Sequence, residues 1–132
     1  MIEAVNLTKR FDDIVAVDHI SATIRDGSVF GLIGTNGAGK STLMNCIAGV
    51  HGTDGGTIYL DGQNITKLPE HKRAKKIGRV FQDPLKGTAF DMTIEENLSI
   101  AYNKNRSRGL QPGLSKKERD LFREKLRLLD MG

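Results

Sequence analysis

The 132-residue sequence has few of the residues that hold disulfide-rich, metal-stabilised or membrane-embedded proteins together. Its one cysteine, Cys46, excludes an internal disulfide and suits a reducing compartment. Its three histidines, His19, His51 and His71, are isolated and share no metal-ligand spacing. No apolar run approaches the ~20 residues that span a bilayer, and the first residues hold no apolar signal-peptide core. We therefore expect a globular protein that works in a reducing compartment.

Aromatic residues are also scarce, at 5%, and the positive charge is unevenly placed. Of the net charge of +4, the basic excess lies in residues 104–132, with nine Lys or Arg against four Asp or Glu. Nucleic-acid-binding proteins usually spread such charge over a face that also carries stacking aromatics, and this tail has only Phe122. We expect no nucleic-acid partner and interpret the tail as a solvated helix surface, with an anionic partner or a membrane surface as the alternative. A smaller basic cluster comprises Lys72, Arg73, Lys75 and Lys76.

The apolar spacing in the first half predicts strands, then a glycine loop, then a helix. Alternation predicts strands near the N-terminus and up to the turn pair Asp26-Gly27. The nearly continuous apolar run in residues 29–33 predicts a central strand with both faces buried. From Ser41 to about Val50 the spacing becomes helical, and Gly49 and Gly52 are late enough to end the helix. Residues 57–66 predict a hairpin that turns at Asp61-Gly62.

The second half shows the start signals of several short elements. Pro69 begins a short basic helix, and residues 77–84 predict another short strand that ends at a proline. Thr93 with Glu96 forms a capping box that opens a helix. A second capping box, Ser115 with Glu118, opens the last helix. The apolar face of this helix comprises Phe122, Leu126 and Leu129.

The strongest signal is GTNGAGKST, residues 34–42, which satisfies the phosphate-loop pattern G-x-x-x-x-G-K-[ST]. Glycines let backbone N–H groups approach phosphate oxygens, and the following helix directs its positive dipole end at the same place. Lys40 should reach the β- and γ-phosphates, and the hydroxyl of Ser41 should bind Mg²⁺. The nucleotide-binding loop is thus predicted to comprise Gly34, Thr35, Asn36, Gly37, Ala38, Gly39, Lys40, Ser41 and Thr42.

This loop alone is shared by GTPases, kinases and many ATPases, but several further segments narrow the choice. Together with GGTIYLDGQNIT, VFQDP and MTIEENL, the sequence resembles the N-terminal portion of an ABC-type ATPase, the ATP-binding subunit of an ABC transporter. The resemblance implies an α/β fold of the P-loop NTPase class, with an antiparallel β subdomain, a partial parallel core sheet and the start of a helical subdomain. It assigns residues 1–82 to the ATPase core and residues 83–132 to the exit of the glutamine loop and the start of the helical subdomain.

The resemblance also implies roles for single residues. Phe11 takes the place of the aromatic residue that stacks on adenine, and Val17 is expected to pack against the same ring. Gln82 matches the glutamine whose amide touches Mg²⁺ or the attacking water. Thr35 stands where proline is frequent in the family, a change that leaves the backbone N–H donors in place. Residues 83–97 correspond to the segment that meets the membrane subunit.

Several parts of an ABC ATPase have no counterpart in the sequence: the LSGGQ-like segment, the later strand ending in Asp-Glu, and the switch histidine. We therefore expect a piece of a longer ATPase that by itself binds nucleotide weakly or not at all and does not hydrolyse it at a useful rate. The complete subunit is expected to bind MgATP in a head-to-tail dimer, at the cytoplasmic face of the membrane, with the permease subunits of a small-solute importer, such as one for amino acids. The alternatives are a soluble ABC ATPase acting on ribosomes or DNA, and a non-catalytic nucleotide-binding module.

Overall fold

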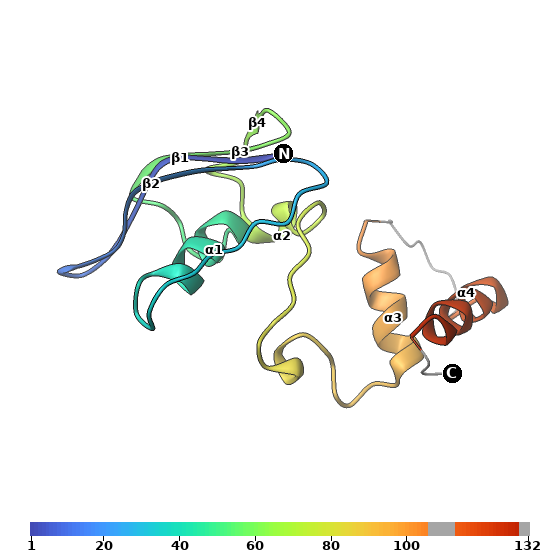
Figure 1. The fold of residues 1–132 in the computed structure, drawn as a ribbon. Helices are drawn as coiled ribbons and strands as arrows, with labels where there is room; N and C mark the ends of the chain where they lie inside the picture. Colours follow the sequence, from blue (N-terminus) through green and yellow to red (C-terminus); the bar gives the residue numbers. More distant parts are fainter. Residues whose placement is uncertain (106–112, 130–132) are drawn as a thin grey trace. The chain divides into compact units, whose positions relative to one another are not determined.

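The computed structural model describes residues 1–105 and 113–129 and divides the chain into two compact units, Met1–Gly78 and Arg79–Gly132 (Figure 1). The first unit holds a sheet with helices α1 and α2, and the second holds helices α3 and α4. In the described part of the chain, no helix has both the length and the apolar character needed to cross a membrane.

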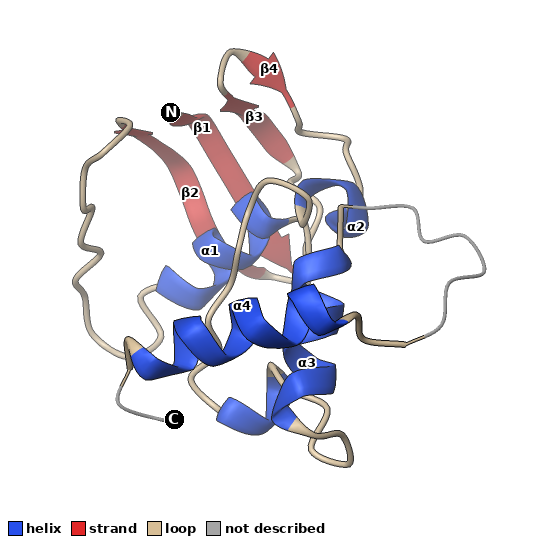
Figure 2. Cartoon of the chain, turned by 90° about the vertical axis from the view of Figure 1, so that its right-hand side faces the viewer, coloured by secondary structure: helices blue, strands red, loops and turns tan. Residues whose placement is uncertain are grey.

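The sheet of the first unit has the strand order β2-β1-β3-β4, and every neighbouring pair is antiparallel (Figure 2). The strands are β1 (Ile2–Phe11), β2 (Ile14–Ile24), β3 (Gly55–Leu60) and β4 (Gln63–Asn64). The predicted hairpin is confirmed: β3 and β4 are joined by Asp61 and Gly62, with φ of 49° and 77°. Positive φ at both turn residues matches the right-handed twist of the strands.

The N-terminal strand departs from simple alternation. Ala4 and Leu7 are both buried, although they are three positions apart, and Val5 is exposed. Between them Asn6 has a φ of 50°, and the pairing of β1 with β2 shifts register there. A bulge of this kind turns the following side chain back to the same face of the sheet. The apolar pattern therefore reaches the core in spite of its irregular spacing.

Helix α1 (Lys40–Ala48) covers one face of this sheet, and together they form the core of the first unit (Figures 1 and 2). The helix ends at Gly49, as predicted, with a φ of 88° and N–H bonds back to Asn45 and Cys46. Cys46 is buried, and burial raises the pKa of its thiol, so it fills space as a small apolar residue. The buried core comprises Ala4, Leu7, Val17, Leu43, Ile58, Leu60 and Ile65.

Two predicted strands are not formed. Residues 29–33 pair with no strand, and the side chains of Val29 and Ile33 are fully or almost fully exposed. Residues 77–84 also form no strand, and the side chain of Val80 is fully exposed. A strand that is apolar on both faces needs hydrogen-bonded neighbours on each side. Among the described residues no strand pairs with either segment, and all pairs in the sheet are antiparallel. The predicted parallel core sheet is therefore absent from the described residues.

The predicted helix at Pro69 is confirmed but short, as α2 (Glu70–Arg73). Of the basic cluster found in the sequence, Arg73 is 3% exposed, whereas Lys72, Lys75 and Lys76 are exposed. Burial lowers the pKa of Arg73. Its guanidinium can be buried because it donates hydrogen bonds to several backbone oxygens.

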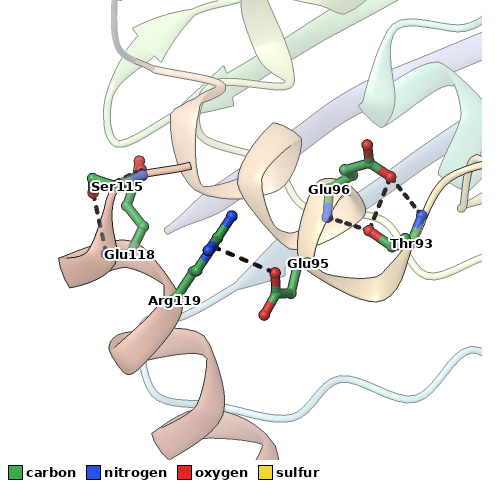
Figure 3. A network of polar contacts seen from close by, with 6 residues as sticks. All are labelled: Thr93, Glu95, Glu96, Ser115, Glu118 and Arg119. Atoms are coloured by element: carbon green, nitrogen blue, oxygen red, sulfur yellow. Dashed lines mark hydrogen bonds and ion pairs between the residues drawn. The ribbon is translucent and has the colours of Figure 1, made fainter. Parts of the chain in front are cut away.

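The first element of the second unit is a 3₁₀ turn at Pro84–Lys86, which is followed by α3 (Ile94–Asn103) and α4 (Lys116–Arg127). Both capping boxes are confirmed, with Thr93 and Glu96 at the start of α3 and Ser115 and Glu118 at the start of α4 (Figure 3). The two helices meet through an ion pair and an edge-to-face ring contact. The residues are Arg119 with Glu95, at 3.7 Å between Nε and Oε2, and Tyr102 with Phe122, at 5.8 Å between ring centres.

Candidate functional site: a phosphate loop at the start of helix α1

The predicted phosphate loop lies at the N-terminal end of α1, and Gly39 fixes where it meets the sheet. Gly39 is the N-cap of α1, with a φ of 66°. A Cβ atom at Gly39 would lie 1.8 Å from the carbonyl oxygen of Ala16 in β2. No side chain larger than hydrogen fits at that distance, and the positive φ itself favours glycine. The loop is therefore anchored against β2 at a position that only glycine can occupy.

The turn before Gly39 is closed by a backbone hydrogen bond between two residues of the loop. The N–H of Ala38 donates to the oxygen of Thr35 at 3.2 Å. Gly37 has a φ of 82°, and a Cβ there would meet no atom within 4 Å, so the space beside it is open. A glycine at positive φ beside open space lets a ligand approach the backbone closely. Asn36 completes this exposed turn.

Lys40 folds its ammonium group over the loop. Its Nζ donates to the carbonyl oxygens of Gly34 at 2.8 Å and Thr35 at 3.1 Å. An ammonium group has three donors and no acceptor, and it can exchange carbonyl oxygens for phosphate oxygens at the same distance. The ammonium group of Lys40 thus already lies against the loop.

The first turn of α1 suits an anion. No side chain caps this end of the helix, and its first turn holds no acidic residue. The N–H groups and dipole of an uncapped helix start favour negative charge. Ser41 is exposed and Thr42 half-buried, so the Ser41 hydroxyl is free of packing and suits an oxygen-binding cation such as Mg²⁺. The residues present therefore fit a triphosphate and its magnesium ion.

Phe11 lies at the tip of the β1–β2 hairpin and is 41% exposed. The ring of His51 packs perpendicular to it, with centres 5.3 Å apart. The Nζ of Lys9 lies 5.1 Å from the centre of the Phe11 ring and 3.7 Å from the Oδ2 of Asp54. Neither His51 nor Lys9 could be assigned from the sequence, because their contacts with Phe11 depend on how the irregular hairpin meets the segment after α1.

Val17 and Gln82, two further predicted site residues, lie outside the phosphate loop. Val17 is 4% exposed and belongs to the buried core with Leu43, which leaves little of its surface for a base. Its predicted contact with adenine rests on the resemblance alone. Gln82 is exposed and belongs to the second unit, and its approach to a magnesium ion stays a prediction.

The far end of α1 is held by Arg73, which sequence reasoning missed. Its Nη1 donates to the oxygens of Cys46 at 2.8 Å and Ile47 at 3.0 Å, in the last turn of the helix. Its Nη2 and Nε donate to the oxygens of Thr66 and Leu68, at 2.8 Å and 2.7 Å. A cation at a helix C-terminus satisfies the last carbonyls and opposes the dipole favourably. Arg73 therefore ties the phosphate-loop helix to the chain after β4.

Comparison with known proteins confirms the class. The ABC transporter family model matches residues 17–131 of the chain. The chain therefore belongs to this family, as an ATP-binding domain, and the α/β fold predicted from its motifs is confirmed as that of ABC ATPase cassettes.

Individual relatives agree. The chain is 41% identical over 126 residues to a tyrosine transport ATP-binding protein of Clostridioides difficile, covering 92% of this chain and 50% of that protein. It is 38% identical over 117 residues to the high-affinity branched-chain amino acid transport ATP-binding protein BraF of Pseudomonas aeruginosa, covering 88% and 45%. Its fold matches the cassette MJ0796, solved as a dimer in a post-hydrolysis state with ADP and Pi, at a TM-score of 0.77, 25% identity and coverage of 98% and 57%. The chain thus spans about half the length of the curated relatives it matches.

Proposed function

We propose that this chain is the nucleotide-binding part of an ABC transporter ATP-binding subunit, which binds MgATP and, as a complete subunit, hydrolyses it to drive solute transport. The observation that carries the proposal is the position of Lys40. Its ammonium group is held over a glycine loop by the oxygens of Gly34 and Thr35, at the uncapped start of α1. Family membership supports the identity of the ligand as ATP.

The loop would act by positioning and by neutralising charge. In phosphoryl transfer, most of the acceleration comes from these two effects around the γ-phosphate. The backbone N–H groups of residues 34–42 would hold the phosphates, and Lys40 would move from its carbonyl partners to the β- and γ-oxygens. Ser41 and Gln82 would hold Mg²⁺, which when bound neutralises charge on those oxygens. Phe11 would stack on the adenine ring, with Val17 behind it.

The partners follow from the same assignment. The complete subunit would pair head-to-tail with a second ATP-binding subunit, and the dimeric structure of the cassette MJ0796 supports the pairing. Residues 83–97 would meet the permease subunits at the cytoplasmic face of the membrane. Exposed apolar side chains in that segment support a protein contact there. They are Leu85, Phe90, Met92 and Ile94.

We propose an amino acid or a related small solute as the cargo. The support is the names of the two relatives above, which are transport proteins for tyrosine and for branched-chain amino acids. The test of this cargo measures uptake of labelled amino acids by cells with and without the gene. The proposal is contradicted if cells without the gene take up every amino acid as well as cells with it.

The proposed activity is tested by Lys40→Ala in the full-length subunit. Loss of an ammonium that contacts the transferring phosphate should lower the rate of ATP hydrolysis by at least about 10²-fold. Lys72→Ala is the matched control, because Lys72 is an exposed lysine of the same unit. Near wild-type hydrolysis by Lys40→Ala would overturn the role of the loop. Hydrolysis that is stimulated by ribosomes or DNA, and by no membrane subunit, would favour the soluble alternative.

A further inference from the structure

The side-chain amide of Asn97, in the first turns of α3, binds a backbone stretch that precedes the helix. Its Oδ1 accepts a hydrogen bond from the N–H of Ala89 at 2.8 Å. Its Nδ2 donates to the carbonyl oxygen of the same residue at 2.9 Å. One amide thus satisfies both backbone groups of Ala89, as a neighbouring strand does in an antiparallel pair.

The same Nδ2 also faces the backbone just before the helix. It lies 3.3 Å from the oxygen of Met92 and 3.1 Å from the oxygen of Thr93. Asn97 therefore closes residues 89–93 into a loop whose two ends are held by one side chain. No other residue type offers an acceptor and two donors at this reach, because aspartate lacks the donors and glutamine is one carbon longer.

This loop carries Phe90 and Met92, two of the four exposed apolar side chains that are proposed above to meet the membrane subunit. A hollow of about 450 Å³ lies within the second unit and is lined by residues of the loop and of α3, among them Phe90, Met92, Ile94 and Asn97. Phe90 is 75% exposed and Met92 44% exposed. Exposed loop side chains present a defined surface only where their backbone is fixed, and Asn97 is the side chain that holds this backbone.

The start of α3 does not itself depend on Asn97. The hydroxyl of Thr93 accepts from the N–H of Glu96 at 3.2 Å, and the Glu96 carboxylate accepts from the N–H of Thr93 at 2.7 Å (Figure 3). The hydrogen bonds that the Glu96 carboxylate accepts from the N–H and from the hydroxyl of Thr93 lower the pKa of Glu96 and keep its charge at the helix N-terminus. A change at Asn97 would therefore remove the side-chain hydrogen bonds that hold the loop and leave the helix start capped. Within the loop, the backbone bond from the N–H of Met92 to the oxygen of Ala89, at 3.0 Å, would remain.

We infer that Asn97 is a positioning residue for the membrane-subunit interface, which holds the loop of residues 89–93 in the shape that docks. The inference rests on the proposed function, since it takes the partner of this loop to be a permease subunit. Asn97 touches neither nucleotide nor magnesium in this scheme. Its removal should separate docking from the chemistry of hydrolysis.

The test compares the full-length subunits carrying Asn97→Ala and Asn97→Asp with wild type, alone and assembled with the membrane subunits in lipid nanodiscs. Asn103→Ala is the matched control, because Asn103 is an asparagine of the same helix whose Nδ2 binds Ser99 and Glu118 and leaves the loop alone. We expect both Asn97 variants to bind the membrane subunits roughly tenfold more weakly or worse. We expect their basal hydrolysis to stay within about twofold of wild type.

Hydrogen–deuterium exchange separates a loop effect from general unfolding. The peptide that covers residues 87–93 should exchange faster in both Asn97 variants, while exchange in residues 1–78 is unchanged. If wild type binds the membrane subunits and Asn97→Ala binds them equally well, this inference alone fails. If wild type does not bind them, the proposed function fails and this inference fails with it.

Discussion

Arg73 donates a hydrogen bond from Nη1 to the backbone oxygen of Cys46, at 2.8 Å. The two residues are 27 positions apart, and the bond joins a short helix after the hairpin to the last turn of the phosphate-loop helix. The same guanidinium reaches three further backbone oxygens, those of Ile47, Thr66 and Leu68. The far end of the helix that carries the phosphate loop is thus held by a buried cation.

The first prediction is that Arg73→Met lowers the free energy of unfolding by about 3 kcal/mol, because it leaves several carbonyls without a charged donor. Urea unfolding of the full-length subunit measures this, and Lys72→Met is the control because Lys72 is exposed beside it. Arg73→Lys should recover part of the loss, since one ammonium cannot reach all four oxygens. Equal stabilities for the Arg73 and Lys72 variants would contradict the role given to Arg73.

The second prediction separates two glycines of the loop. Gly39→Ala places a Cβ on the oxygen of Ala16, so the loop must leave β2 and nucleotide affinity should fall at least about tenfold along with stability. Gly37→Ala meets no atom within 4 Å and should cost only about 1–2 kcal/mol of backbone strain. Thermal unfolding and titration with MgATP measure both. A Gly37 variant as damaged as the Gly39 variant would show that contact with β2 is not what fixes the loop.

The third prediction concerns Phe11. Phe11→Ala should weaken adenine-nucleotide binding by about 1–3 kcal/mol, because stacking on the ring is lost. Phe11→Tyr keeps the ring face and should bind as wild type does. Titration with ATP and with inorganic triphosphate distinguishes the roles, since only ATP affinity should change. If ATP affinity does not change, Phe11 serves packing with His51 only.

The fourth prediction is that the stability of the fold depends on pH through the amino group of Met1. The Met1 amino group donates to the carboxylates of Asp26 and Asp61, and these bonds raise its pKa above the ordinary 8.0. The amino group, as hydrogen-bond donor and as charge, lowers the pKa of Asp61 below 3.8. The amine's contribution is complete below pH 8.0 and is lost as pH rises through its raised pKa; that of Asp61 is complete above pH 3.8 and is lost as pH falls through its lowered pKa.

Acetylation of Met1 tests this dependence, because it removes the charge. The difference in thermal midpoint between the free and acetylated chains should be largest between these two limits and should vanish at both extremes of pH. All these groups are exposed, so the difference should be small and should shrink in high salt. A difference that is independent of pH would contradict the pairing.

Features set by neighbouring residues could be predicted from the sequence. Both capping boxes, the Asp61-Gly62 turn and the end of α1 at Gly49 depend on residues only a few positions apart, and all four are confirmed. The loop of residues 34–42 is local in the same sense. Its glycines, lysine and helix start lie in one continuous stretch.

Features that depend on distant partners could not be predicted in the same way. The bulge at Asn6, the burial of Arg73 and the contact of His51 with Phe11 each require knowledge of which strands pair and where the chain returns. The strand predicted over residues 29–33 is not formed, for a related reason. Its apolar residues indicate that the segment is buried, but they do not indicate which neighbouring strands would pair with it. The loop held by Asn97 is intermediate between these two groups. Its contacts reach back only eight positions, but no periodic pattern in the sequence indicates them.

The measurement that tests the central claim most directly is a crystal structure of the full-length subunit with Mg²⁺ and a non-hydrolysable ATP analogue. We predict that the triphosphate lies in the loop of residues 34–42, with its oxygens about 3 Å from the backbone N–H groups at the start of α1. We also predict that the Nζ of Lys40 has left the oxygens of Gly34 and Thr35 for the β- and γ-phosphates. A triphosphate bound elsewhere, with Lys40 still on those two carbonyls, would contradict the account.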